Sequence, residues 1–324
     1  MELLNRMVNA GCKYAVMEVS SFGLVQHRIG PTHFEVGVFT NLTQDHLDYH
    51  KTMENYYQAK RMMFDECDDA IINMDDEYGK RLYDEIKCRK YTCGIGNTAD
   101  FYADNISIRA DGTEFDYYYN GKSAHIVTQM IGMFNVFNVM AAISVCLKIG
   151  LEINDILKAL KEYKGVKGRC EIIPTGKDFT VICDYAHTPD AIENILSSVK
   201  EYTSGDLICL FGCGGNRDSK KRPLMAKAAA KYADRLIITS DNPRDEIPEA
   251  IIDDILAGLS DKEIPFDVVV DRTEAIYHSL KIAQKGDIIV LAGKGHEDYQ
   301  VLSGNEHIHF DEREIVSEGL KLIN

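Results

Sequence analysis

The sequence predicts an α/β protein made of two domains, and three observations support this fold class. Short apolar runs rich in Val and Ile, typical of buried strands, alternate with longer stretches that have helical spacing. A length of 324 residues exceeds what one hydrophobic core usually serves. Between the two strand-rich halves, a segment of alternating residues predicts a small antiparallel sheet.

The first half opens with two apolar runs, 13–19 (KYAVMEV) and 35–42 (EVGVFTNL), which we interpret as buried parallel strands. Residues 52–66 have apolar positions three and four apart, which predicts a helix, and 70–75 (AIINMD) predicts another strand. From 101 to 129 three alternating segments are separated by Asp-Gly and Asn-Gly, which favour tight hairpin turns.

Two helices, predicted over 134–150 and 153–163, complete the first domain, which we end at the glycine-containing junction 164–168. The second domain then holds five strands separated by helices, a pattern that predicts a doubly wound, mainly parallel sheet. Its strands are expected over 179–185, 206–212, 234–240, 266–271 and 287–293, with helices starting near Pro189, Lys220, Pro248 and Thr273 and a last helix after Phe310.

Composition excludes several function classes. The formal net charge of −15 disfavours binding to nucleic acid or to anionic lipid. No apolar run of 18 residues and no signal-peptide pattern occurs, so we expect no membrane partner and a cytoplasmic location. The nine cysteines are scattered, without CxxC pairs or zinc-like spacing, and we interpret them as reduced thiols without a catalytic role.

Polar residues follow six of the expected strands, where open α/β sheets bind their ligands. Together they predict a ligand cleft between the two domains. In chain order they are Glu18, Ser20 and Ser21; Asn41, Asp45 and His46; Asp184 and His187; Gly212, Gly214, Gly215, Arg217 and Asp218; Asp241, Asn242, Pro243 and Arg244; and Gly293, Lys294, Gly295, His296 and Glu297.

Some of these groups suit particular ligands. Glu18 and His46, at neighbouring strand ends, are compatible with Mg²⁺ or Mn²⁺ that bridges phosphate oxygens. The Gly-rich turn before Arg217 resembles an anion-binding nest, whereas no dinucleotide fingerprint is present. The phosphate-binding pattern GxxxxGK[ST] is also missing: the GKS at 121–123 has Asp116 at the first glycine position and lies in an expected hairpin.

Nine strings, in order along nearly the whole chain, resemble the Mur ligase family, the ATP-dependent amide-forming enzymes of peptidoglycan precursor synthesis. The resemblance is greatest to its diaminopimelate-adding type (MurE). The strings are EVSSFGLVQHR, FTNLTQDHLDYH, QAKRMMF, GMFNVFNVMAA, VKGRCE, DYAHTPDA, FGCGGNRDSKKRPLM, DNPR and GKGHEDYQ.

The resemblance implies a central P-loop-type ATPase domain over 1–168 and a C-terminal, Rossmann-like, amino-acid-binding domain over 169–324. The family's uridine-nucleotide-binding domain and its P-loop would precede Met1, so we expect a chain truncated at its N-terminus. Implied partners are ATP, Mg²⁺, UDP-MurNAc-dipeptide and meso-diaminopimelate, and the missing N-terminal portion.

Roles carried over from the family fall into four groups. Glu18, His46 and Lys60 would bind Mg²⁺, Lys60 after carbamylation by CO₂. Ser20, Gln26 and Arg28 would bind the nucleotide-linked dipeptide; Phe22 stands where the family often has His. Asn135 and Asn138 would flank adenine, Arg169 would reach the γ-phosphate, and Asp184 would lie on the ribose or phosphate side. The diaminopimelate-binding set would be Arg217, Asp241, Asn242, Pro243, Arg244, Gly293 and Glu297.

Chemistry selects the substrate within the family. Diaminopimelate differs from lysine by a distal carboxylate, which the planar guanidinium of Arg244 can bind bidentately, whereas a cation there would repel the distal ammonium of lysine. Alternatives are a lysine-adding or other Mur-like ligase, such as a folylpolyglutamate-synthase relative, or a catalytically silent module that keeps only the amino-acid pocket.

Overall fold

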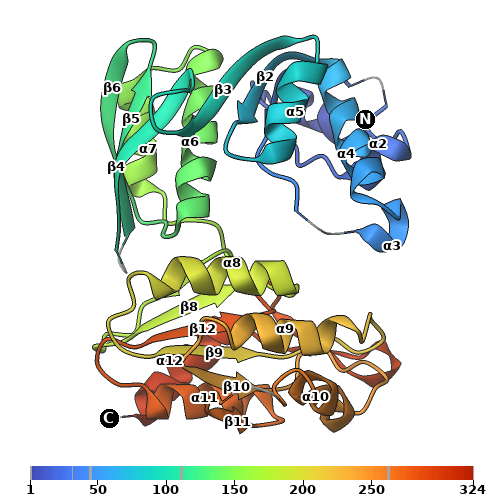
Figure 1. Ribbon diagram of the computed structural model, residues 1–324, viewed down its shortest axis with the longest axis vertical. Helices are drawn as coiled ribbons and strands as arrows, with labels where there is room; N and C mark the ends of the chain where they lie inside the picture. Colours follow the sequence, from blue (N-terminus) through green and yellow to red (C-terminus); the bar gives the residue numbers. More distant parts are fainter. Residues whose placement is uncertain (1, 31, 44–45, 110–111, 261–262, 324) are drawn as a thin grey trace. The chain divides into compact units, whose positions relative to one another are not determined.

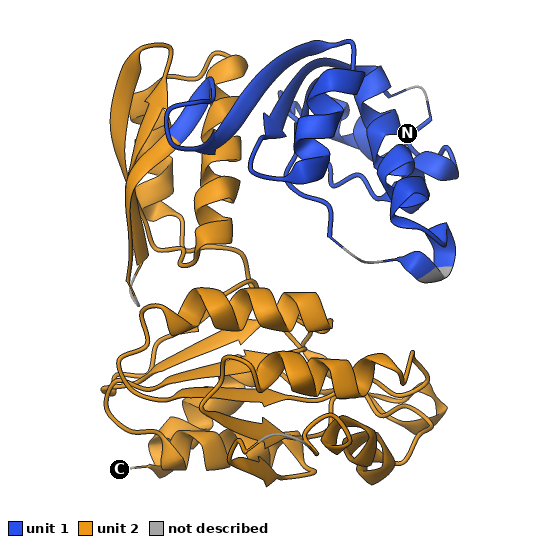
Figure 2. Ribbon diagram, viewed as in Figure 1, with its two compact units in different colours: residues 1–102 blue, residues 103–324 orange. Residues whose placement is uncertain are grey.

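A computed structural model of the chain describes residues 2–30, 32–43, 46–109, 112–260 and 263–323. The chain divides into two units, residues 1–102 and 103–324 (Figure 2). This division falls within the predicted first domain. The predicted boundary at 168/169 lies in the loop between the last helix of the first half and the next strand, and it stays a prediction.

Unit 1 contains three parallel strands, in the order β1 (Phe34–Phe39), β2 (Cys67–Asn73) and β3 (Arg89–Ile95). Its core packs Tyr57, Phe64 and Leu82 from the helices against Ile72 of β2. Side-chain caps fix two of these helices: Thr52 Oγ1 accepts from Asn55 N, and Asp76 accepts from the first turn of α5. The helical segments are α1 (Glu2–Asn9), α2 (Ser21–Val25), α3 (Leu47–His50), α4 (Met53–Arg61), η1 (Met62–Glu66) and α5 (Glu77–Glu85).

The expected strand over 13–19 is wrong. Residues 14–19 form neither helix nor strand, and the side chain of Val16 is 99% exposed. A strand exists only when a neighbour completes its backbone hydrogen bonds, and no described strand pairs with this segment. The apolar pattern is therefore present without the partner that would turn it into a strand.

The first part of unit 2 is an antiparallel meander covered by helices. Asn120 and Gly121 both have positive φ, 47° and 72°, as the predicted Asn-Gly hairpin turn requires. A 2.8 Å hydrogen bond between Tyr117 Oη and Ser144 Oγ joins the meander to α6. The elements are β4 (Phe101–Arg109), which begins in the last residues of unit 1, β5 (Gly112–Tyr119), β6 (Lys122–Thr128), α6 (Met133–Lys148) and α7 (Ile153–Glu162).

The rest of unit 2 is a six-stranded sheet in the order β11-β10-β9-β12-β8-β7, parallel except for β7. All five predicted strands and their predicted helix starts are confirmed. The five are β8 (Thr180–Asp184), β9 (Leu207–Phe211), β10 (Arg235–Ile238), β11 (Phe266–Val268) and β12 (Ile288–Ala292), and the sixth strand, β7 (Glu171–Ile173), was not predicted. The helices are α8 (Pro189–Lys200), α9 (Lys221–Ala229), α10 (Pro248–Leu256), α11 (Arg272–Ile282) and α12 (Glu312–Leu322).

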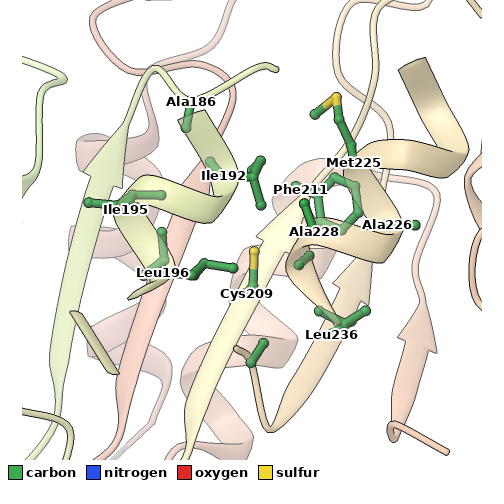
Figure 3. Packing of buried hydrophobic residues seen from close by; sticks show 14 of the residues in the cluster. Ala186, Ile192, Ile195, Leu196, Cys209, Phe211, Met225, Ala226, Ala228 and Leu236 are labelled. Carbon is green, nitrogen blue, oxygen red and sulfur yellow. The ribbon is translucent and has the colours of Figure 1, made fainter. Parts of the chain in front are cut away.

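Strand β9 shows why this sheet is doubly wound. Cys209 and Phe211 point to one face and pack with α8 and α9, as Figure 3 shows, while Ile208 and Leu210 pack on the other face with α11 and α12 (Figure 1). Both faces are apolar because both are covered by helices. A short antiparallel ribbon, β13 (Tyr299–Val301) and β14 (His307–His309), with η2 (Ser303–Asn305) between its strands, precedes α12.

The cysteines are free, as predicted, and most are buried. Burial raises the thiol pKa to about 12 for Cys67, Cys93, Cys209 and Cys213, so these thiols stay protonated and inert. Within the described residues, no helix is both long and apolar enough to cross a membrane.

Candidate active site

In unit 1, three predicted site residues line one hollow. Glu18, Ser20 and Arg28 border a cavity of about 370 Å³, and most of its other wall residues are apolar side chains of α1 and of the 15–19 segment. Ser20 Oγ also caps α2 by accepting from Gly23 N at 3.0 Å. Gln26 lies just after α2, at its C-cap, and is exposed. The hollow thus brings a carboxylate, a hydroxyl and a guanidinium together beside an apolar wall.

His46 and Lys60 meet at the ring of Tyr56. The imidazole of His46 lies edge-on to Tyr56, with 5.9 Å between ring centroids, and Lys60 Nζ lies 5.4 Å from the same ring. Phe22, the departure from the family pattern, packs against His46 at 5.0 Å. Because Phe22 follows the Glu18–Ser20 segment, it links these two groups of predicted residues.

The donor types in this region fit a hard divalent cation. Glu18 supplies an exposed carboxylate and His46 an imidazole, while Lys60 becomes an oxygen donor only after carbamylation. Among the residues that the structure describes, no three His, Cys, Asp or Glu side chains are grouped as a metal site. The assignment of Glu18, His46 and Lys60 to Mg²⁺ therefore stays a prediction.

In unit 2, the ends of β9, β10 and β12 meet at one edge of the sheet. Gly212 makes this possible: a Cβ there would lie 2.4 Å from the carbonyl oxygen of Thr239. Gly293 has a φ of 119°, which L side chains rarely adopt, and it begins the turn that leads from β12 to Glu297. The two glycines let three polar loops approach each other closely.

The DNPR segment at the end of β10 is largely buried. Asp241, Asn242 and Pro243 are buried, and Arg244, with a φ of 51°, is half-buried. Arg244 Nη1 donates to the carbonyl of Gly215 at 2.8 Å. A Cβ on Gly214 would lie 3.0 Å from that Nη1 and 3.7 Å from Cγ of the exposed Arg217, so both arginines flank this glycine.

A fully buried cation, Lys294, lies behind this segment. Its Nζ lies 2.5 Å from Asn242 Oδ1, 3.1 Å from Asp241 Oδ1 and 3.4 Å from Glu297 Oε2. The Asp241 contact is an ion pair between opposite charges, both of them buried. Although burial acts to raise the pKa of Asp241, Lys294 and Arg272 hold it below its usual range. Lys294 was among the polar residues that follow the predicted strands, but the sequence predicted no binding role for it.

A second buried pair was not predicted. Arg272 and Glu312, both fully buried, form an ion pair with 2.8 Å between Nη2 and Oε1. Arg272 also donates to the carbonyl of Ala292 at 2.8 Å and to that of Ser240 at 3.4 Å. It therefore fixes the ends of β10 and β12. Nothing in the sequence pairs two charges 40 positions apart, so only the fold reveals this contact.

The remaining candidates surround Tyr185 and the start of α6. Arg169 is exposed, and its guanidinium lies 5.0 Å from the ring of Tyr185. Asp184 is half-buried, and it accepts from Cys170 N at 2.6 Å and from Ala186 N at 2.8 Å. Burial outweighs these bonds and raises the pKa of Asp184. The Asp184 carboxylate therefore already fastens the 168–170 loop to β8.

The two asparagines of α6 contact each other. Asn135 Nδ2 donates to the carbonyl of Ile131 at 2.8 Å, and Asn135 Oδ1 accepts from Asn138 Nδ2 at 3.2 Å. Asn135 is buried, whereas Asn138 is exposed. The residue that caps α6 is Gly132, so neither asparagine is the helix cap.

Comparisons with known proteins decide the family. Residues 1–146 match the Mur ligase middle domain, and residues 168–295 match the Mur ligase glutamate ligase domain. The chain belongs to the Mur ligase family. The resemblance stated from the motifs is thereby confirmed.

Among curated Mur ligases, the chain is 47% identical over 322 residues to UDP-N-acetylmuramoyl-L-alanyl-D-glutamate–2,6-diaminopimelate ligase 1 of Clostridium acetobutylicum. It is 45% identical over 322 residues to the corresponding ligase of Clostridioides difficile. These matches cover 99% and 98% of the chain, but only 66% of each relative.

Solved structures agree with this assignment. A structure of a UDP-N-acetylmuramoyl-L-alanyl-D-glutamate–2,6-diaminopimelate ligase matches with a TM-score of 0.68 and 35% identity, over 98% of this chain and 66% of that one. Folylpolyglutamate synthase of Thermotoga maritima, 19% identical with a TM-score of 0.59 over 79% of this chain and 57% of that one, shares the fold alone.

Proposed function

We propose that the chain forms the catalytic and amino-acid-binding parts of an ATP-dependent amide ligase. This ligase adds meso-diaminopimelate to UDP-N-acetylmuramoyl-L-alanyl-D-glutamate in peptidoglycan precursor synthesis. The observation that carries the proposal is the polar sheet edge of unit 2, at the ends of β9, β10 and β12, where Arg244 and Arg217 flank Gly214 and Asn242 contacts both Arg244 and the Glu297 carboxylate. Identities of 47% and 45% to curated diaminopimelate ligases support it.

The polar sheet edge of unit 2 suits an amino acid with charged groups at both ends. Arg244 is anchored through Nη1 on the carbonyl of Gly215, so its planar guanidinium is already oriented. A carboxylate of the substrate can bind to such a guanidinium through two parallel hydrogen bonds. Glu297 is an acceptor for an ammonium group. Lysine, which lacks the distal carboxylate, would leave Arg244 without its partner.

ATP is the expected co-substrate. In the proposed reaction, the dipeptide carboxylate attacks the γ-phosphorus of ATP, which gives an acyl phosphate and ADP. The amino group of diaminopimelate then attacks the acyl carbon, and the tetrahedral intermediate expels phosphate. We assign Arg169 to the γ-phosphate, Asp184 to the ribose or phosphate side, Asn135 and Asn138 to adenine, and Ser20, Gln26 and Arg28 to the dipeptide.

Glu18, His46 and carbamylated Lys60 are the residues that would bind Mg²⁺, which would screen the repulsion between the carboxylate and the phosphates. Two neighbouring side chains, Arg28 and Tyr56, support these groups. Arg28 offers a positive charge beside the Glu18 hollow, and Tyr56 holds the His46 ring and the Lys60 stem in place.

We further propose that catalysis needs the portion of the ligase that supplies a phosphate-binding loop. Several large apolar side chains of α1 and of residues 14–19 are exposed, with Leu3 at 64%, Val8 at 70%, Tyr14 at 55% and Val16 at 99%. Several exposed apolar side chains on one part of a protein are typical of an interface. A segment that adds a strand beside residues 14–19 would cover these side chains.

The test is ADP formation with UDP-MurNAc-dipeptide, ATP and either meso-diaminopimelate or lysine. We expect ADP release that depends on diaminopimelate when the portion carrying the phosphate-binding loop is present, and none from the 324-residue chain alone. A preference for lysine would contradict the substrate assignment. Diaminopimelate-dependent turnover by the chain alone would refute the need for another portion.

The alternative is a catalytically silent module that keeps only the amino-acid pocket. It is favoured by one observation, the absence of GxxxxGK[ST] from this sequence. Adding the missing portion distinguishes the two: a silent module stays without ATPase activity, whereas the ligase gains it.

A further inference from the structure

The polar sheet edge of unit 2 contains a charged residue, Lys294, that none of the proposed binding roles uses. Lys294 is fully buried, so its side chain reaches no solvent. Besides the carbonyl of Tyr299 at 2.9 Å, all of its hydrogen-bond and ion-pair partners in the described chain are Asn242, Asp241 and Glu297. Each of these three is a candidate diaminopimelate-binding residue.

Lys294 is one of two donors that set which way the Asn242 amide faces. Asn242 Oδ1 accepts from Lys294 Nζ at 2.5 Å and from Val301 N at 2.9 Å, so the oxygen is turned toward two donors. The amide nitrogen is consequently turned to the opposite side, where it donates to Glu297 Oε2 at 3.2 Å. An amide has an oxygen and a nitrogen of nearly equal size, and only its hydrogen-bond partners choose between the two orientations.

The same cation also helps to hold Glu297. Glu297 Oε2 accepts hydrogen bonds from Lys294 Nζ and Asn242 Nδ2. Glu297 Oε1 accepts one from the hydroxyl of Tyr185 at 3.4 Å. Three donors, from the ends of β8, β10 and β12, therefore fix this carboxylate. A group held this way loses little freedom when an ammonium binds to it.

We propose that Lys294 is a positioning residue for the amino-acid substrate. It holds the Asn242 oxygen inward, so that the amide N–H group and the Glu297 carboxylate are presented together to the charged groups of the substrate. The proposal rests on the proposed function, because it takes the amino-acid pocket to be that of a diaminopimelate-adding ligase.

The test compares Lys294→Met with the wild-type chain by calorimetric titration of meso-diaminopimelate. We expect the affinity to fall roughly ten- to a hundredfold, because the Asn242 amide oxygen and the Glu297 carboxylate each lose a charged donor and are held less firmly. Lys285→Met is the matched control: Lys285 is exposed at the other end of β12, and its replacement should leave the affinity unchanged. An unchanged affinity in Lys294→Met would overturn the proposal.

Removing a buried cation can also unfold a protein, because it leaves carboxylates without a counter-charge. The pair Asp241→Asn and Lys294→Met/Asp241→Asn addresses this, since Asp241→Asn removes the nearest such carboxylate. We expect the double variant to bind diaminopimelate at least tenfold more weakly than Asp241→Asn alone. Equal affinities for these two variants would overturn the positioning role.

A measurement without ligand separates this proposal from the proposed function. The side-chain amide signals of Asn242, observed by NMR, should shift and exchange faster in Lys294→Met or in the double variant than in their parents. Unchanged signals would overturn the positioning role even if diaminopimelate binds. Shifted signals in a chain that binds no diaminopimelate would uphold the positioning of Asn242 and refute the assigned substrate.

Discussion

Arg244 shows how the backbone can place one functional group. A non-glycine residue with a φ of 51° costs about 1–2 kcal/mol, and the surrounding contacts must offset this strain. Two of them do so: Arg244 N donates to the carbonyl of Val301 at 3.1 Å, and Nη1 donates to that of Gly215 at 2.8 Å. Strain that is kept at a candidate binding residue points to a role in which orientation matters.

Replacing Arg244 with lysine tests whether this orientation is used. Arg244→Lys keeps the positive charge but removes the planar fork, so we expect meso-diaminopimelate to bind roughly tenfold to a hundredfold more weakly. Arg235→Lys, on the exposed ion pair with Asp267, is the matched control and should bind normally. Isothermal titration measures both, and an Arg244→Lys chain with full affinity would exclude a bidentate contact.

For single residues, the sequence predicted site candidates that lie in motifs, but it did not predict the contacts that depend on the fold. DNPR and GKGHE predicted Asn242, Arg244 and Glu297 as a set, and the structure brings them to one edge of the sheet. Lys294 and Arg272 could not be predicted as their partners, because a buried cation is recognisable only from the carboxylates that enclose it.

The elements of unit 2 meet at the carboxyl ends of β8, β9, β10 and β12, and a buried ion pair holds two of these ends. Arg272 is the first residue of α11, and Glu312 is the first of α12, so their pairing joins two helices that cover the same face. The same guanidinium donates to carbonyls at the ends of β10 and β12. The geometry of the polar sheet edge thus depends on the positions of α11 and α12.

Breaking this pair should be costly. In Arg272→Met, Glu312 would be left buried without a counter-charge, and we expect a loss of about 3–5 kcal/mol in the free energy of unfolding. Arg235→Met removes an arginine from a pair whose side chains are 38% and 33% exposed, and it should cost less than about 1 kcal/mol. Denaturant unfolding measures both; similar small losses would mean that the buried pair does not stabilise the sheet edge.

Strand predictions were confirmed where the described chain supplies a neighbouring strand for pairing. Five of the six strands of the second sheet were predicted, each from a run of apolar residues, and their parallel pairing follows from the helices between them. The antiparallel edge strand β7 was not predicted. The run at 13–19 has the same composition but no described neighbour, and it remains irregular. Composition shows that a segment can pair, but pairing itself is a property of the surrounding sheet.

For the molecule as a whole, the chain spans 66% of the length of its curated relatives. The net charge of −15 makes the local arrangement more notable, since the proposed ligands are mostly anionic. Cations gather at the candidate sites: Arg28 beside the hollow of unit 1, and Arg169, Arg217 and Arg244 at the sheet edge of unit 2. Unit 1 also exposes apolar side chains of α1 and residues 14–19, among them Leu3, Val8 and Val16.

We infer that the polar sheet edge of unit 2 recognises an amino acid with a carboxylate at each end. Titrating meso-diaminopimelate and L-lysine separately into the 324-residue chain tests it most directly, because the measurement needs neither ATP nor catalysis. We predict that diaminopimelate binds at least tenfold more tightly than lysine, since only diaminopimelate offers a distal carboxylate to Arg244. Equal binding, or tighter binding of lysine, would contradict the account.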